Sequence, residues 1–428
     1  MNNIKGKKIL ILGANPETAG LVIKCNELGV DTYVTDYNPY AFAKRYAKHP
    51  LNIDATDVKS LEDLIRKEKI DGVICGVAES LMRTYAKICD DFSFPCYGNK
   101  ELFNIFVNKE NFKNICKKFN APVVEDYHLC NYSDEELKKI KMPVVVKPVD
   151  SCSSKGIAIC TNLNELKSGI KGALENSKSK RILIEKYMTG DEVIVYYAFQ
   201  DGKPFLVSMC DRYTNKDQKG VAQLPTSYIF PSKYLKEYQK TYDEIVKKMF
   251  VSLNIKNGFM FIQSFIDEKG KVRFYEPGYR LNGAQEHYIV SKTTGIDAKE
   301  CLINLALSGK ESDIELSSLA DPFLNGKYGC KLSPLIKLGK INKIVGLDSI
   351  QKIKNVVSIN PSYIDGDEVT GYGTLKQIVC RFFIVADTKE ELKQTIDEIY
   401  EIFDVLDMDG KSMLMTKFDS SIILKNYE

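Results

Sequence analysis

A lysine at the end of an apolar run is the first feature of the chain that could do chemistry. Lys147 closes the sequence VVVK and stands directly before Pro148 and the loop VDSCSSKG at residues 149–156. A strand that leads into a loop of small residues can lay backbone N–H groups along phosphates, and a lysine adds a point charge. Lys109, in an earlier helical segment, could add a second charge. Taken alone, each lysine is more often a surface residue. The loop adds Ser153, Ser154 and Gly156 as candidate phosphate contacts.

Two acids stand in an otherwise apolar stretch, ILIEKYMTGDEVIVYYAF, at residues 182–199. Glu185 and Glu192 are seven residues apart, with Gly190 between them. A strand with free edge peptides can read an adenine through its backbone, and a carboxylate farther on can accept hydrogen bonds from ribose hydroxyls. The segment Glu185, Lys186, Tyr187 and Met188 would then face the base, and Glu192 the ribose. The alternative is that both acids lie on the solvent face of a half-buried strand.

The sequence GFMFIQSFIDEKGKVRFYEPGYR, at residues 258–280, predicts a hairpin with its turn at residues 267–271. Gln263 and Glu276 lie on its two arms, and antiparallel pairing can bring such side chains to one face. An oxygen-rich pair of this kind suits Mg²⁺, a hard cation that also bridges nucleotide phosphates. Arg280 could reach a developing negative charge. The alternative is a surface ion pair between Glu276 and Arg280, which would contribute little energy.

The elements that position these residues begin with an alternation of apolar runs and helical patterns over the first hundred residues, typical of a doubly wound parallel sheet. A dinucleotide fold with Asp36 on the ribose is disfavoured, because GANPETAG (13–20) lacks the G-x-G-x-x-G spacing. Residues 99–122 predict one amphipathic helical segment that Pro122 ends. Near the C-terminus, QIVCRFFIVA (377–386) predicts a strand. A capping box at Thr388 and Glu391 then opens a helix with an apolar stripe. The stripe consists of Leu392, Ile396, Ile399 and Phe403.

The composition is that of a soluble globular protein of about three domains, with 44% hydrophobic and 27% charged residues. The net charge of +3 is spread over both signs, so we expect no nucleic-acid partner. Twelve cysteines without a CxxC pair, and three histidines, indicate neither a zinc site nor a disulfide framework. No apolar stretch is long enough to span a bilayer. We therefore expect a cytoplasmic protein with no membrane partner.

The order of these motifs resembles the ATP-grasp superfamily, in its carboxylate–amine ligase and carbamoyl-phosphate-synthase-like branch. The resemblance implies an α/β and α+β multidomain protein. It predicts an N-terminal doubly wound α/β domain at 1–105, a two-lobed ATP-grasp domain at 106–314 and a small α+β domain at 315–428. It also implies an ADP-forming ligase that activates a carboxylate as an acyl phosphate for attack by an amine. Both substrates would be small molecules, the cofactors would be ATP and Mg²⁺, and the assembly could be a homodimer.

By the same resemblance, Lys109 and Lys147 contact ATP phosphates, Gln263 and Glu276 bind Mg²⁺, and Arg280 is catalytic. The loop at 149–156 and the polar segment 211–227 are candidate lids over the reaction. Glu79, at the end of the third predicted strand, could meet the amine, although an acid there is more often a helix N-terminal residue.

The sequence departs from the family pattern at two positions. Gln263 replaces the first acidic metal ligand, as in the carbamoyl phosphate synthase branch. Gly278 stands where the family has asparagine, so nearby Asn282 is a candidate to assist a second ion. These departures leave two alternatives open. One is an enzyme that phosphorylates bicarbonate or formate, and the other is a nucleotide-binding protein without catalysis.

Overall fold

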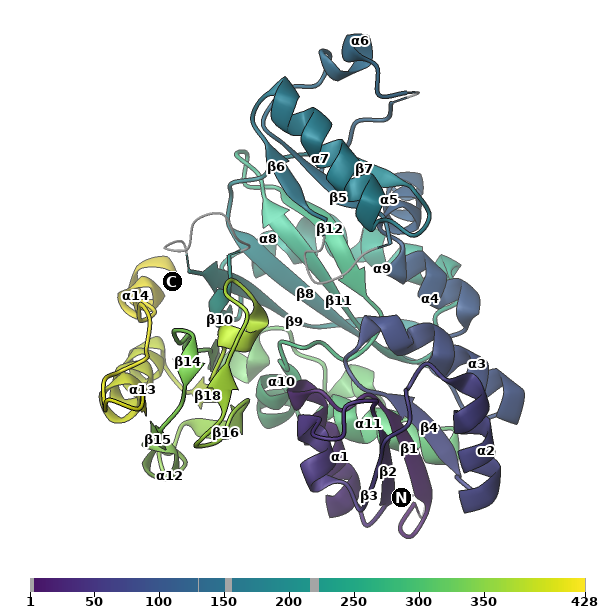
Figure 1. Ribbon diagram of the computed structural model, residues 1–428, viewed down its shortest axis with the longest axis vertical. Helices are drawn as coiled ribbons and strands as arrows, with labels where there is room; N and C mark the ends of the chain where they lie inside the picture. Colours follow the sequence, from purple (N-terminus) through teal and green to yellow (C-terminus); the bar gives the residue numbers. More distant parts are fainter. Residues whose placement is uncertain (1–3, 130, 151–155, 216–222, 428) are drawn as a thin grey trace.

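A computed structural model describes residues 4–129, 131–150, 156–215 and 223–427. The chain forms three regions, seen in Figure 1 as an N-terminal region, a small lobe at the top and a long central sheet that continues into the C-terminal region. In the described residues, no helix combines the length and the apolar character that crossing a bilayer would require. The ten cysteines described are free thiols.

The N-terminal region contains a four-stranded parallel sheet in the order β3-β2-β1-β4. The strands are β1 (Lys8–Leu12), β2 (Asp31–Thr35), β3 (His49–Leu51) and β4 (Gly72–Cys75), and the helices are α1 (Ala19–Glu27), α2 (Val58–Glu68) and α3 (Met82–Phe92). The predicted parallel α/β arrangement is therefore present. The sequence missed β3, because its three residues contain no apolar run.

The segment predicted as one helix at 99–122 is two helices, α4 (Lys100–Val107) and α5 (Lys109–Lys118). Asn108 separates them with non-helical angles, φ −94° and ψ 111°. Its side-chain oxygen accepts hydrogen bonds from the N–H groups of Glu110 (3.0 Å) and Asn111 (3.1 Å), which is the geometry of a helix N-cap. Lys109 is consequently the first residue of α5.

The small lobe is an antiparallel sheet of three strands, β6-β5-β7, covered by α7. Its elements are α6 (Asp134–Leu137), β5 (Val144–Pro148), β6 (Ala158–Cys160), α7 (Leu163–Asn176) and β7 (Ile182–Lys186). The lobe has its own hydrophobic core, and α5 lies between it and the central sheet. Backbone hydrogen bonds between residues 122–124 and Phe274 tie the lobe to that sheet.

The central sheet has eight strands in the order β12-β11-β8-β9-β10-β13-β18-β16. They are β8 (Glu192–Gln200), β9 (Lys203–Thr214), β10 (Pro225–Phe230), β11 (Gly258–Ile266), β12 (Val272–Gly278), β13 (Tyr328–Leu332), β16 (Val356–Pro361) and β18 (Cys380–Ala386). β10 pairs with β13, so one sheet crosses the boundary at residue 315 that the sequence predicted between two domains. The C-terminal region nevertheless has a core of its own.

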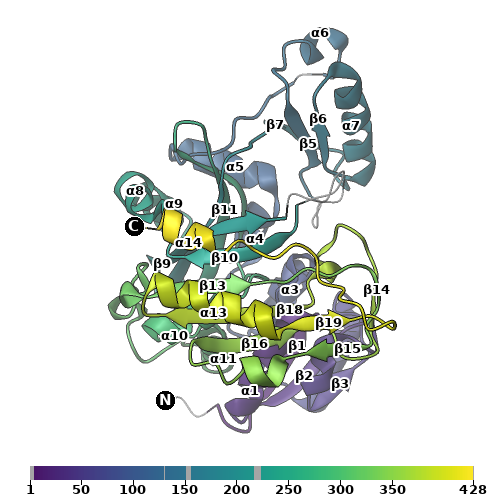
Figure 2. The same ribbon diagram turned by 90° about the vertical axis from the view of Figure 1, so that its left-hand side faces the viewer.

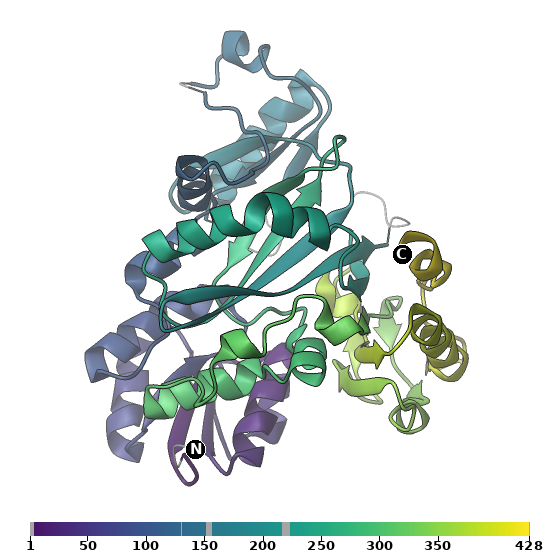
Figure 3. The same cartoon turned by 180° about the vertical axis from the view of Figure 1, so that it is seen from behind.

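Helices cover both ends of this sheet. α8 (Leu235–Tyr238), the π-helical turn η4 (Gln239–Asp243) and α9 (Glu244–Ser252) lie behind the central strands (Figure 3), and α13 (Lys389–Ile402) and α14 (Ser421–Asn426) cover the C-terminal strands (Figure 2). Thr388 caps α13, and the predicted apolar stripe of that helix is buried. The remaining elements are α12 (Leu347–Ile350), the strand pairs β14 (Gly339–Lys340) with β17 (Glu368–Val369) and β15 (Lys343–Val345) with β19 (Asp404–Leu406), and the short 3₁₀ helices η1 (Pro16–Thr18), η2 (Phe42–Tyr46), η3 (Glu79–Leu81), η5 (Leu316–Ser318), η6 (Leu324–Gly326) and η7 (Leu375–Gln377).

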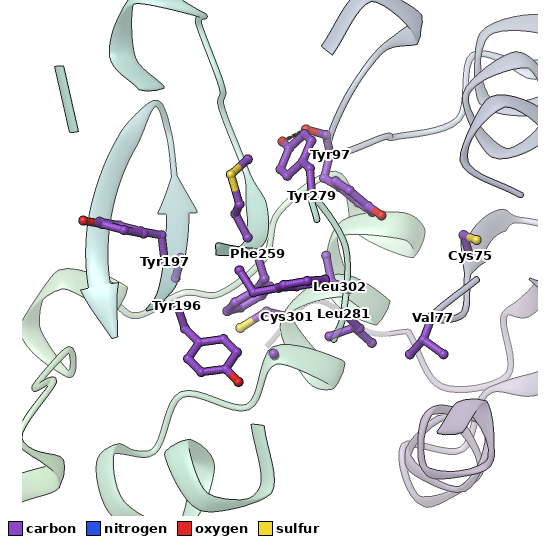
Figure 4. Close-up of a cluster of buried hydrophobic side chains, with 14 of the residues drawn as sticks. Cys75, Val77, Tyr97, Tyr196, Tyr197, Phe259, Tyr279, Leu281, Cys301 and Leu302 are labelled. Atoms are coloured by element: carbon purple, nitrogen blue, oxygen red, sulfur yellow. Dashed lines mark hydrogen bonds between the residues drawn. The ribbon is translucent and has the colours of Figure 1, made fainter. Parts of the chain in front are cut away.

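One hydrophobic core joins the N-terminal region to the central sheet. α10 (His287–Thr294) and α11 (Ala298–Ser308) follow the sheet, and α11 packs against β4 and α1. A Cβ at Gly72 of β4 would lie 2.3 Å from the Ala306 carbonyl oxygen, so this contact requires glycine. Figure 4 shows part of this cluster, with Cys75 and Val77 of the N-terminal region on one side, Tyr196, Tyr197 and Phe259 of the sheet on the other, and Leu281 and Leu302 between them. This core fixes the N-terminal region against the strands that carry the candidate site.

Candidate active site

Lys147 and Glu185 form a buried ion pair in the small lobe. Lys147 is the second-last residue of β5 and is paired with Leu183 of β7, so Glu185 lies diagonally opposite on the same face. The Lys147 ammonium is 2.5 Å from Glu185 Oε2, and Lys113 Nζ from α5 is 2.5 Å from Oε1. Glu185 is only 3% exposed. Burial raises the pKa of Glu185, but Lys147 and Lys113 outweigh it, so the pKa lies below its usual value.

The position of Glu185 rules out the solvent-exposed alternative for this acid, because its carboxylate points inward and holds two lysines. The backbone of the same segment is partly committed as well. The Lys186 N–H donates to the Glu125 carbonyl (2.9 Å), and the Tyr187 N–H donates to the Pro143 carbonyl (3.1 Å). The predicted contact with a base therefore falls to other groups of the segment, which ends at the buried Met188.

Glu192 is the first residue of β8 and lies directly opposite Arg212 of β9. The two side chains form an ion pair, and the Tyr275 hydroxyl donates to Glu192 Oε2 (3.2 Å). Burial lowers the pKa of Arg212, but Glu192, Tyr228 and Tyr275 together raise it by more, so the guanidinium stays charged. Glu192 is therefore held in one orientation at the edge of the site. Gly190 precedes it because a Cβ there would lie 1.7 Å from the Ile266 carbonyl oxygen.

Gln263 and Glu276 face each other across the β11–β12 hairpin, in direct register. The turn at residues 267–271 is present, with the Asp267 N–H bonded to the Lys271 carbonyl (2.8 Å). Lys109 Nζ, from α5, lies 3.5 Å from Glu276 Oε1. The structure thus brings the helix-borne lysine to the predicted metal pair. Within the described ranges there is no group of three histidine, cysteine or acidic residues that could hold a metal, so the oxygen donors at this place are the amide of Gln263 and the carboxylate of Glu276.

Gly278 is packed against an aromatic ring. It pairs with Phe261 of β11, and a Cβ at position 278 would lie 2.2 Å from the Phe261 ring. The guanidinium of Arg280 lies over the same ring, 5.0 Å from its centroid. The ring therefore takes the space of the missing asparagine side chain and also supports the arginine.

Arg280 pairs with Glu79 of the N-terminal region, with 3.4 Å between Nη2 and Oε2. Its Nη1 donates to the Leu281 carbonyl (3.0 Å). The alternative surface pair with Glu276 is wrong, since Arg280 is largely buried and Glu79 is its acidic partner among the described residues. Burial raises the pKa of the Glu79 carboxyl. The positive charges of Arg280 and Lys109 oppose this rise, and the negative charge of Glu276 adds to it. Glu79 thus lies within electrostatic range of the residues predicted for phosphate and metal binding.

The remaining predicted residues have different positions. Ser153 and Ser154, like parts of both candidate lids, lie outside the described residues. Gly156 has φ +77°, a conformation that favours glycine. Asn282 is buried, its amide group donates to the Tyr196 hydroxyl (3.3 Å), and its oxygen accepts from the Ala284 N–H (3.0 Å). Neither of these contacts involves Gln263 or Glu276.

Three residues that the sequence analysis missed contribute to this site, namely Lys113, Arg212 and Tyr275. Lys113 follows Lys109 by four residues, so the two side chains share a helix face. This spacing could have predicted that Lys113 also belongs to the site. Arg212 and Tyr275 could not be predicted from nearby sequence, because their contacts with Glu192 depend on how the strands pair.

Residues 140–285 match the family model of the ATP-grasp domain. This match covers about a third of the chain, and it agrees with the resemblance to the ATP-grasp superfamily that the motif order had suggested. The carbamoyl phosphate synthase large chain of Clostridium perfringens (strain 13 / Type A) is 23% identical over 384 residues, which cover 86% of this chain and 34% of that protein. The chain therefore spans about a third of the length of the curated relative.

Solved structures share the fold of this chain over almost its whole length. The biotin carboxylase domain of the Hydrogenobacter thermophilus 2-oxoglutarate carboxylase, a dimer in complex with MgADP, ADP and bicarbonate, has a TM-score of 0.77 at 17% identity. The superposition covers 93% of this chain and 90% of the biotin carboxylase chain. The L-amino acid ligase of Bacillus licheniformis has a TM-score of 0.75 at 18% identity. This superposition covers 94% of this chain and 99% of the ligase chain.

Proposed function

We propose that this ATP-grasp protein is an ADP-forming ligase that activates a small-molecule carboxylate as an acyl phosphate for attack by an amine. The observation that carries the proposal is the contact of Lys109 with Glu276 beside Gln263. In this contact, the lysine proposed for phosphate binding lies next to the two groups proposed as metal ligands, and Arg280 pairs with Glu79, which is within electrostatic range of Lys109 and Glu276. ATP and Mg²⁺ are the cofactors proposed for this arrangement, as the relative in complex with MgADP suggests.

The proposed residues divide the work of binding the nucleotide. Lys109 and Lys147 hold phosphates, and Glu185 positions Lys147. The segment from Glu185 to Met188 faces the adenine, Glu192 holds the ribose, and Ser153, Ser154 and Gly156 close over the phosphates. Gln263 and Glu276 would hold Mg²⁺, which supplies positive charge to the phosphate oxygens. We propose that residues 1–105, 106–314 and 315–428 act as three functional domains, although strands on both sides of residue 315 belong to one sheet.

The chemistry needs positioning and charge rather than a covalent nucleophile. A carboxylate oxygen of the substrate attacks the γ-phosphorus, and the bond from that phosphorus to the ADP oxygen breaks. The amine nitrogen then attacks the acyl carbon, loses a proton, and inorganic phosphate leaves. Arg280 is the catalytic cation in this scheme, since it can stabilise the developing negative charge. Glu79 would accept a hydrogen bond from the amine in this scheme.

A phosphate-release screen over paired carboxylates and amines, with ATP and Mg²⁺, tests this proposal. We expect release that requires both the acid and the amine. Nucleotide binding without release under any pair would indicate the catalytically silent alternative, and failure to bind nucleotide would reject the proposal.

Phosphorylation of bicarbonate or formate is the second candidate, favoured by Gln263 at the place of an acid and by the carbamoyl phosphate synthase relative. Release with bicarbonate or formate alone would support it. A homodimer is the assembly we expect from the resemblance, and light scattering would test it.

A further inference from the structure

Helix α5 presents a lysine to each half of the candidate site. Lys109, in its first turn, is 3.5 Å from Glu276 of the central sheet. Lys113, one turn later, is 2.5 Å from Glu185 of the small lobe. The nucleotide site proposed above uses Lys109, Lys147 and Glu185, and Lys113 has no part in it. Lys113 is nevertheless only 1% exposed, and lysines are almost never buried so deeply unless their charge is paired.

Three oxygens hold the Lys113 ammonium in place. It is 2.5 Å from Glu185 Oε1, it donates to the Val124 carbonyl (2.7 Å), and it lies 3.7 Å from Asp126 Oδ1. The Lys147 ammonium has fewer such contacts. Among the described residues, Glu185 is the one carboxylate within 4 Å of it, at 2.5 Å. Of the two lysines on Glu185, Lys147 is therefore the one that can leave.

A second buried acid lies beside Glu185. Asp126 is directly opposite Glu185 in an isolated bridge to β7, and like charges in such register repel each other. Lys113 contacts both carboxylates, and Lys117, one turn further along α5, is 2.7 Å from Asp126. The exposed ring of His128 is 3.2 Å from the same carboxylate. Burial raises the pKa of Asp126, but the basic groups around it outweigh burial, so the pKa lies below its usual value.

The charges of this cluster balance without Lys147. Two ionised acids, Glu185 and Asp126, contact two lysines of α5, Lys113 and Lys117. Lys147 is then a surplus cation on Glu185. A buried carboxylate that loses its only cation is strongly destabilised. Because Lys113 stays on Glu185, Lys147 can turn to another anion without leaving that carboxylate uncompensated. The anion expected there is the triphosphate of the proposed nucleotide.

We propose that Lys113 is a positioning residue that allows Lys147 to pass from Glu185 to the nucleotide phosphates. Lys113 contacts neither the nucleotide nor the reacting atoms in this scheme. It keeps Glu185 charged and fixed while the Lys147 ammonium moves from the carboxylate to a phosphate oxygen. The inference rests on the proposed nucleotide site and deepens it, because it explains how a lysine in a buried ion pair stays available to a ligand.

The affinity for phosphates, separated from the affinity for the base, tests this role. Calorimetry with Mg²⁺ measures the binding of a non-hydrolysable ATP analogue and of adenosine, and the ratio of the two affinities reports the phosphate contacts. In Lys113→Met the ratio should fall about tenfold, the size of one charged hydrogen bond, because Lys147 is then the only cation on Glu185. Lys118→Met, at an exposed lysine of the same helix, should keep the parental ratio.

A double variant tests whether the effect passes through Lys147. The amide of Glu185→Gln needs no cation, so Lys113→Met combined with Glu185→Gln should recover the parental ratio. Adding Lys147→Met to this double variant should lower the ratio again. Lys113→Gln keeps a donor for the Val124 carbonyl and replaces Lys113→Met if that variant does not fold.

An equal ratio in Lys113→Met and the parent would overturn the proposal. If free energy of unfolding were lost without any change of the ratio, Lys113 would have a structural role only. Failure of the double variant to recover the ratio would also overturn it. These measurements concern binding, so a parent protein without turnover leaves them unaffected. A parent protein that binds adenosine as tightly as the analogue would instead contradict the phosphate contacts of the proposed function.

Discussion

The ring of Phe261 occupies the space that a side chain at Gly278 would need, since a Cβ there would lie 2.2 Å from the ring. Arg280 also contacts this ring, with its guanidinium 5.0 Å from the ring centroid. The glycine and the phenylalanine thus pack together and support the arginine that we propose as catalytic. Where the family pattern has asparagine, this chain has Gly278, and its partner Phe261 on β11 fills the space of the absent side chain.

Gly278→Asn should therefore destabilise the protein rather than restore a metal ligand. Forcing extra atoms into a packed site costs about 1–3 kcal/mol, and we expect a loss of free energy of unfolding in that range. Gly172→Asn is the control, because Gly172 lies inside α7 and a Cβ at this position would have no neighbouring atom within 4 Å. Urea unfolding measures both variants. A stable Gly278→Asn protein with tighter Mg²⁺-dependent nucleotide binding would contradict this description.

Lys147→Met should lower stability as well as nucleotide affinity. It removes one of the two cations that compensate Glu185, and breaking a buried ion pair costs about 3–5 kcal/mol. We expect the low end of that range, because Lys113 remains 2.5 Å from the carboxylate. The double variant Lys147→Met with Glu185→Gln should recover part of the loss in urea unfolding. Lys393→Met, which breaks a helix-surface pair, should cost less than about 1 kcal/mol. Equal losses of unfolding free energy in Lys147→Met and Lys393→Met would show that the Lys147–Glu185 pair contributes no more than a surface ion pair.

Arg280→Ala should impair turnover far more than ATP affinity. Loss of one electrostatic contact in the transition state costs on the order of 3 kcal/mol, or about a hundredfold in kcat. Nucleotide affinity, measured by calorimetry, should change only a few-fold because the proposed phosphate contacts are Lys109 and Lys147. Arg45→Ala, at an exposed arginine, is the control. Equal turnover in Arg280→Ala and the parent would reject the catalytic role.

Glu286 should make stability depend on pH in a defined window. Its folded pKa is raised to about 8 from 4.5 by burial. Between these values the folded state keeps a proton that the unfolded state releases, so the free energy of unfolding falls as pH rises from about 4.5 to 8. The contribution is at most about 1.4 kcal/mol per pH unit and is fully present only below the unfolded pKa.

Glu286→Gln should remove this dependence, since its amide does not titrate. The difference in unfolding free energy between Glu286→Gln and the parent should grow in favour of the variant from pH 5 to pH 8. Glu398→Gln, at an exposed position of α13, should leave the parent's pH profile unchanged. Parallel profiles for Glu286→Gln and the parent would mean that Glu286 is charged in the folded protein.

Local signals in the sequence predicted the parts of the site that depend on near neighbours. The hairpin turn at residues 267–271 was readable, but its register alone would pair Gln263 with Tyr275, and an irregularity between Gln263 and Ser264 brings Gln263 opposite Glu276. The helix break at Asn108 had a readable N-cap signal that the amphipathic pattern concealed. Contacts between distant residues were not predictable in the same way. Lys113 and Glu185 are 72 residues apart, and Glu79 and Arg280 are 201 apart. The pairing of β10 with β13, which carries the sheet across residue 315, is also set by the fold as a whole.

A crystal structure with Mg²⁺ and a non-hydrolysable ATP analogue tests the central claim most directly. The account predicts the triphosphate between the small lobe and the central sheet, with Lys109 and Lys147 at its oxygens, Glu276 on the metal and Glu192 at the ribose. A nucleotide bound elsewhere, with Lys147 still turned only to Glu185 and Lys109 only to Glu276, would contradict it.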